Sequence, residues 1–123
     1  MKTIPKVARR VLIVEDDTLV RTALAHLLGR LGYHTVAVGS VAAGLEALDG
    51  QTYAILDLKL PDGLGTIILE RIREEQRPIR VAIATGTSDL GLLSDAERHR
   101  PDLVLRKPVD LNALLEWLRN AAG

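Results

Sequence analysis

The chain has 123 residues, of which 47% are hydrophobic and 26% are charged, the balance of one globular domain with a substantial core. Its 16 basic and 16 acidic residues cancel and only 2% of its residues are aromatic, which argues against direct binding of nucleic acid by charge or by base stacking. The absence of cysteine excludes disulfides and thiol catalysis and agrees with the cytoplasmic location that we expect.

Membrane association is not expected either. No apolar run approaches the roughly 20 residues that are needed to cross a bilayer. The first ten residues carry charge but contain no apolar signal-peptide core. We therefore expect a flexible N-terminal arm over residues 1 to 9 and a single domain over residues 10 to 123.

Taken in chain order, the sequence alternates short β-rich runs with longer helical patterns. We predict strands over residues 10–15, 34–38, 53–57, 79–84 and 102–106. Each is followed by a predicted helix, over residues 18–31, 40–48, 66–75, 88–100 and from 110 onward. Thr18, Ser40 and Asp110 are the expected N-caps, and Gly32 is the expected C-terminal glycine of the first helix.

Five strands that alternate with five helices indicate an α/β fold with a parallel sheet covered on both faces. Right-handed crossovers make this a doubly wound, flavodoxin-like three-layer sandwich. If the second strand lies at an edge, the strand order is 2-1-3-4-5. In such folds ligands bind outside the carboxyl ends of the strands.

Polar residues end four of the five predicted strands: Glu15-Asp16, Asp57, Thr85 and Lys107. A carboxylate such as Asp57 at the end of a buried strand is costly to desolvate unless partners support it. Three gathered acids would repel one another, and Mg²⁺, which prefers oxygen ligands, would relieve that repulsion.

This set of residues suggests chemistry on a phosphoryl group. Asp57, with an unperturbed pKa of about 4, would be an anionic nucleophile at neutral pH and could form an aspartyl phosphate. The metal and the Lys107 ammonium would stabilise the transferring oxygens, and the Thr85 hydroxyl could donate to one of them.

The motifs are Val-Glu15-Asp16-Asp, then Leu-Asp57-Leu-Lys-Leu-Pro with Gly65 eight residues after the Asp, then Ala-Thr85-Gly and Lys107-Pro. Each motif is weak alone, but their order on a fivefold strand-helix pattern is specific. From about residue 10 to residue 121 the chain resembles a receiver domain of the response regulators of two-component signalling.

The resemblance implies a role for each matching residue. Asp57 would accept phosphate from a sensor histidine kinase or a phosphotransfer protein, and Thr85 and Lys107 would contact that phosphate. Mg²⁺ would be held by Asp16 directly, by Glu15 largely through water, by Asp57 and by the backbone carbonyl of Lys59. The Lys107-Pro108 peptide would be cis. The face formed by the fourth helix, the fifth strand and the fifth helix would then act on an unknown downstream protein. Whether two copies form a homodimer through this face is left undecided by the sequence.

One departure from the family pattern concerns Val104, because receiver domains usually carry Tyr or Phe at this place. An aromatic switch coupled to Thr85 is therefore not expected, and we predict that residues 86–100, which contain Gly86 and Gly91, reorder instead. Leu90, Leu92 and Leu93 fit either the core or a partner-binding face. His26, His34 and His99 are expected to be solvated or packed, and Trp117 partly buried.

The main alternative is a Mg²⁺-dependent phosphatase or phosphotransferase that uses an aspartyl phosphate. Such enzymes usually carry a second acid two residues after the nucleophile, where this chain has Lys59. A dinucleotide-binding protein is disfavoured because no glycine follows the first strand. The lack of an output segment after Gly123 favours a stand-alone regulator or relay shuttle, although a receiver excised from a longer protein would look identical.

Overall fold

The structure is a computed structural model and describes residues 9 to 121. Apart from Arg9, the arm predicted over residues 1 to 9 lies outside the described residues. Within the part of the chain that is described, none of the helices has the length and apolarity that crossing a bilayer requires.

The centre of the fold is a parallel sheet of five strands, which are β1 (Arg10–Val14), β2 (His34–Val38), β3 (Tyr53–Asp57), β6 (Arg80–Thr85) and β7 (Leu103–Arg106). Their spatial order is β2-β1-β3-β6-β7, which equals 2-1-3-4-5 when only these strands are numbered. The predicted fold class and strand order are therefore confirmed.

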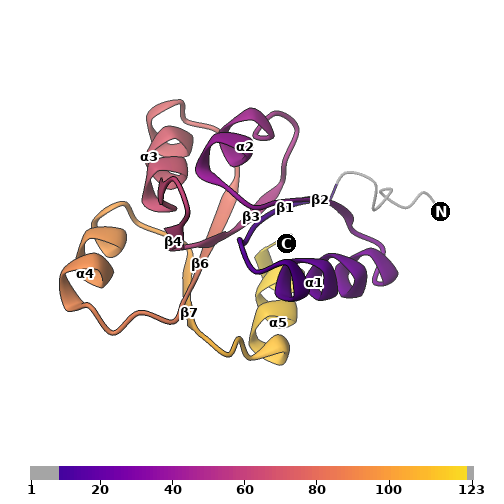
Figure 1. Cartoon of the computed structure of the whole chain (residues 1–123). Helices are drawn as coiled ribbons and strands as arrows, with labels where there is room; N and C mark the ends of the chain where they lie inside the picture. Colours follow the sequence, from indigo (N-terminus) through magenta and orange to yellow (C-terminus); the bar gives the residue numbers. More distant parts are fainter. Residues whose placement is uncertain (1–8, 122–123) are drawn as a thin grey trace.

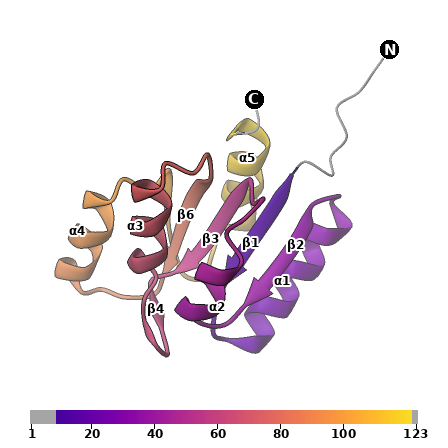
Figure 2. The ribbon, with the colours of Figure 1, turned by 90° about the horizontal axis from the view of Figure 1, so that it is seen from above.

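Five helices cover the two faces of this sheet: α1 (Thr18–Arg30), α2 (Val41–Glu46), α3 (Thr66–Glu74), α4 (Leu90–Arg98) and α5 (Leu111–Ala121). Figure 1 shows α2 and α3 on one side of the sheet and α1 and α5 on the other, with α4 near β6 and β7. Figure 2, seen from above, shows the strands running between these helix layers. The arrangement is the three-layer sandwich that the pattern predicts.

Most element boundaries differ from the predicted ones by one or two residues. The N-cap of α1 is Asp17 and not Thr18, because the Asp17 carboxylate accepts hydrogen bonds from the backbone N–H groups of Leu19 and Val20. Ser40 and Asp110 act as caps as expected, and Gly32 follows α1 with a φ of 97°.

Between the predicted strand over residues 53–57 and the predicted helix over residues 66–75, the chain forms a small antiparallel hairpin of β4 (Lys59–Leu60) and β5 (Gly63–Leu64). Strands of two residues are too short to show a periodic pattern in the sequence.

Alternation along the strands divides the core in two. Val11 and Ile13 of β1 belong to the cluster packed under α1 and α5, whereas Leu12 and Val14 belong to the cluster under α2, α3 and α4. Because side chains alternate with a period of two, Asp57 follows Tyr53 and Ile55 toward the α1 and α5 side.

The C-terminal half of α5 is attached to the sheet through aromatic residues. The Tyr53 hydroxyl donates a buried hydrogen bond of 3.1 Å to the Leu118 carbonyl. The Tyr53 ring also meets Trp117 edge-on at a centroid distance of 5.7 Å and Tyr33 at 6.4 Å. Trp117 is half-buried, as expected, and reports on the packing of α5 against the sheet.

Gly65 is required by a close approach of two backbone segments. Its N–H donates to the Leu58 carbonyl at 2.8 Å, and a Cβ atom at this position would collide with the backbone carbonyl oxygen of Asp57. Since the clash is with backbone rather than with a flexible side chain, the strand that ends in Asp57 would have to move.

We predict that Gly65→Ala lowers the free energy of unfolding by about 1–3 kcal/mol, the usual cost of overpacking. Gly29→Ala is the matched control, because nothing lies within 4 Å of a Cβ atom there in helix α1. It should raise the stability by up to about 1 kcal/mol. Urea unfolding measures both, and equal stabilities of the two variants would contradict this account of Gly65.

Candidate functional site

The polar residues predicted at the strand ends meet at one edge of the sheet. Asp57 lies opposite Ala84 in the register of β3 and β6, and Thr85 lies opposite Arg106 in the register of β6 and β7. The backbone N–H of Lys107 donates to the Thr85 carbonyl at 2.9 Å. The strand ladder therefore fixes where the polar side chains of three neighbouring strands emerge.

The Lys107 ammonium joins two carboxylates that come from distant parts of the chain. Its Nζ atom lies 2.6 Å from Glu15 Oε1 and 3.1 Å from Asp57 Oδ2. Both carboxylate residues are buried, with relative exposures of 6% and 8%. Charge-assisted hydrogen bonds of this kind are among the strong ones in proteins, and they support two buried acids here.

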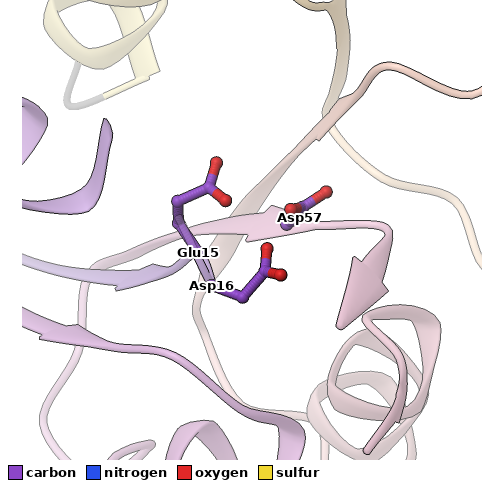
Figure 3. Close-up of side chains that lie close together, drawn as sticks. All are labelled: Glu15, Asp16 and Asp57. Carbon is purple, nitrogen blue, oxygen red and sulfur yellow. The ribbon is translucent and has the colours of Figure 1, made fainter. Parts of the chain in front are cut away.

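Asp16 adds a third carboxylate at the surface of the same site. One oxygen from each of Glu15, Asp16 and Asp57 can be chosen so that all three lie within 4.8 Å of one another. Figure 3 shows these three side chains gathered where β1 and β3 end. A set of carboxylate oxygens with more negative charge than Lys107 can neutralise fits a hard divalent cation such as Mg²⁺. Lys59, whose carbonyl was the fourth predicted ligand, begins β4 two residues after Asp57.

Burial and hydrogen-bond partners shift the pKa values of the two buried acids, Asp57 and Glu15, in opposite directions. Burial raises the pKa of Asp57 to about 6, although the hydrogen bond from Lys107 opposes the rise and the nearby Glu15 adds to it. Burial also acts to raise the pKa of Glu15, but hydrogen bonds from Lys107 and from the Asp17 N–H outweigh it and lower the pKa. Asp57 is thus a weaker acid than an unperturbed Asp side chain, whose pKa is about 4, yet it is largely ionised at pH 7.

The Thr85 hydroxyl is buried near the site but is engaged elsewhere. Its Oγ1 accepts a hydrogen bond of 3.0 Å from the Thr87 N–H. No hydrogen bond between the side chains of Thr85 and Asp57 occurs within the described residues 9–121. The fold brings Thr85 to the correct edge of the sheet and ties its hydroxyl to the segment that leads into α4.

Two contacts near the site have no signal in the local sequence. Arg21 Nη1 donates to the Glu15 carbonyl at 2.8 Å and so holds the turn that carries the acids. The Asp62 carboxylate accepts from the backbone N–H groups of Val41 at 2.7 Å and Ala42 at 3.0 Å, which ties the β4–β5 hairpin to the start of α2. A solvated Arg and a loop Asp are the ordinary readings of these positions, and only the fold supplies their partners.

The remaining expectations concern residues around the site. The Lys107-Pro108 peptide is cis, as predicted. Val104 packs with the cluster under α2, α3 and α4, together with Leu92 and Leu93, whereas Leu90 is 79% exposed. The histidines lie apart from the acids: His26 and His34 are exposed, and His99 Nε2 lies 3.0 Å from Glu70 Oε2.

The comparison with known proteins agrees with this geometry. The family model described as the response regulator receiver domain matches residues 11–119. Among solved structures, the CheY-like response regulator receiver domain protein from Methanospirillum hungatei JF-1 superimposes with a TM-score of 0.85, at 28% identity and over 92% of both chains.

Two curated relatives are regulators that are longer than this chain. The photosynthetic apparatus regulatory protein RegA of Rhodobacter capsulatus is 31% identical over 89% of the chain and 61% of its own length. The regulator of RpoS of Escherichia coli K12 is 35% identical over 94% of the chain but only 35% of its own length. The family model, which spans nearly the whole sequence, and the matching fold lead to one conclusion: the chain belongs to the response regulator receiver domain family of two-component signalling.

Proposed function

We propose that this receiver domain is a phosphoacceptor switch. Asp57 takes a phosphoryl group from the phosphohistidine of a sensor kinase or a phosphotransfer protein, and the face formed by α4, β7 and α5 changes in response. The observation that carries the proposal is the Asp57 carboxylate, held 3.1 Å from the Lys107 ammonium and beside Glu15 and Asp16. A nucleophile, a cation for the phosphoryl oxygens and a set of metal ligands then share one site.

The proposed step is a displacement at phosphorus. An Asp57 carboxylate oxygen attacks the phosphorus atom and forms an O–P bond, while the P–N bond to the donor imidazole breaks. The imidazole nitrogen keeps the electron pair of that bond and takes up a proton. The Lys107 ammonium stabilises the negative charge on the transferring oxygens because it already lies beside the nucleophile.

Glu15, Asp16, Asp57 and the Lys59 carbonyl would hold Mg²⁺ in this site. The bound metal supplies positive charge that offsets the anionic nucleophile and the anionic phosphoryl group. The chemistry of the donor set supports this assignment, since three carboxylates face one ammonium.

A chain of side-chain to backbone hydrogen bonds connects Thr85 to α4 and supports the proposed readout. Thr85 Oγ1 accepts from the Thr87 N–H at 3.0 Å, Thr87 Oγ1 accepts from the Asp89 N–H at 3.1 Å, and Asp89 caps α4 through Gly91 and Leu92. If the Thr85 hydroxyl turns toward a phosphate on Asp57, the first of these bonds is lost. The start of α4 is then loosened without an aromatic residue at Val104.

The exposed side of α4 gives this readout a partner surface. Leu90 opens the helix with 79% of its surface accessible, whereas Leu92 and Leu93 pack on the core. A downstream protein, or a second copy in a homodimer, would meet the face of α4, β7 and α5 near Leu90. An apolar side chain whose surroundings change on phosphorylation can favour a partner in one state only.

The first test is phosphate uptake. Incubation of the protein with acetyl phosphate and MgCl₂ should add the mass of one phosphoryl group, as read by intact mass spectrometry. Asp57→Asn should abolish the gain because the nucleophilic oxygen is lost. Asp49→Asn is the matched control, since the Asp49 side chain is 92% exposed and pairs with Arg77 away from the site.

Uptake that persists in Asp57→Asn, or no uptake by the wild-type chain, would overturn the proposed function. Many rounds of hydrolysis of a phosphomonoester by the same protein would instead support the phosphatase alternative.

The second test concerns the hydrogen-bond chain to α4. Phosphorylation should speed amide hydrogen exchange at Thr87, because its N–H loses the Thr85 acceptor, and exchange in the first turn of α4 should rise with it. The first turn of α1, which Asp17 caps in the same way, is the internal control. Unchanged protection of Thr87 and residues 90–92 in the fully phosphorylated protein would contradict this readout.

A further inference from the structure

A cavity of about 650 Å³ lies between α1 and α5 and reaches the phosphoacceptor site. One wall comes from α1, the floor comes from the sheet, and the other wall comes from α5 and the residues before it. The lining residues are almost all aliphatic, and they include Ile13, Val20, Ala23, Leu24, Val109 and Leu111.

The cavity exists because the two ends of α5 are packed differently. Its C-terminal half is held against the sheet by Tyr53 and Trp117. Among residues 9–121 no aromatic ring lines the cavity, and short side chains such as those of Ala23, Ala84 and Val109 line it instead. The cavity opens to solvent, since Val20 and Leu111 in its lining are 44% and 46% exposed, and its volume lies in the range of about 300–1,000 Å³ that is usual for ligand sites.

The charges at one end of the cavity indicate what its occupant would carry. The charged side chains in the lining are Glu15, Asp57 and Lys107, and Lys107 is already paired with both acids. Two carboxylates against one ammonium leave a net negative charge, to which the neighbouring Asp16 adds. Apolar walls with an anionic end suit an apolar body with one positive charge.

We propose that this cavity binds a small hydrophobic molecule that carries a single cationic nitrogen. The apolar body lies between α1 and α5, and the nitrogen lies against Glu15 and Asp57. Such a ligand competes for the carboxylates that hold the metal and accept the phosphoryl group, so its binding inhibits phosphorylation. This regulatory consequence rests on the proposed function, whereas the binding itself does not.

The binding test uses two rigid probes of the same shape and opposite charge, 1-aminoadamantane and adamantane-1-carboxylate. Isothermal titration is carried out on the full chain without phosphodonor or Mg²⁺. The amine should bind saturably with a stoichiometry of one, and the carboxylate should bind at least about tenfold more weakly because it meets like charge.

Matched variants locate the binding. Ala23→Leu and Val109→Phe fill the cavity from opposite walls and should each weaken amine binding by about tenfold or more. Thr22→Leu adds the same side chain to the adjacent, exposed position of α1, which does not line the cavity, and should leave the affinity unchanged. Unfolding followed by Trp117 fluorescence verifies that each variant is folded.

Three results of the binding measurements would overturn the proposal. They are the absence of saturable amine binding, equal affinity for the two probes, and equal affinity of Ala23→Leu, Val109→Phe and the wild-type chain for the amine. A dimer in sedimentation that Ala23→Leu disrupts and Thr22→Leu preserves would also overturn it, because a second copy would then cover the cavity.

Phosphate uptake separates this proposal from the proposed function. Amine binding without phosphate uptake would refute the phosphoacceptor role and leave the ligand site standing. Phosphate uptake without amine binding would refute the ligand site and leave the phosphoacceptor role standing. If both occur, 1-aminoadamantane should slow uptake in the wild-type chain and in Thr22→Leu, and should lose this effect in Ala23→Leu.

Discussion

The Lys107 ammonium between Glu15 and Asp57 is the interaction on which the site depends. It joins residues that are 92 and 50 positions apart in the sequence, so it forms only when β1, β3 and β7 lie in their native order. Without this cation, two carboxylates would be buried side by side, which is costly at low dielectric. The hydrogen bond from the Lys107 N–H to the Thr85 carbonyl fixes the backbone position from which the Lys107 side chain extends. Gly65 allows the segment after β3 to pass close to the backbone of Asp57.

One ammonium cannot neutralise three carboxylates, and the remaining negative charge makes the site favourable for cations. Glu15 holds the shorter hydrogen bond to Lys107, and burial, with a smaller contribution from the nearby Glu15, raises the pKa of Asp57 to about 6. An incompletely compensated carboxylate beside two further acids is suited to a divalent cation. The same imbalance gives the apolar cavity between α1 and α5 its preference for a cationic group, so both proposals have one electrostatic origin.

The fold and the gathering of Glu15, Asp57 and Lys107 at one edge of the sheet could be predicted from the sequence, because both depend on simple patterns. Buried runs ended by Glu15, Asp57, Thr85 and Lys107 place polar groups at the carboxyl ends of parallel strands, whatever the details of packing. The cap at Asp17 and the hairpin after Asp57 were missed because neighbouring residues compete as caps and because two-residue strands have no period. The partners of Arg21 and Asp62, the pKa of Asp57 and the α1–α5 cavity depend on distances between segments, which a single sequence does not encode locally.

The acids gathered around Lys107 should form a divalent cation site. Isothermal titration of MgCl₂ into the wild-type chain and into Asp16→Asn tests it most directly, since Asp16 is exposed and its replacement leaves the buried bonds of Lys107 in place. We expect a single Mg²⁺ site in the wild-type chain and an affinity that is lower by about tenfold or more in the variant. No saturable binding by the wild-type chain, or the same affinity in both proteins, would contradict it.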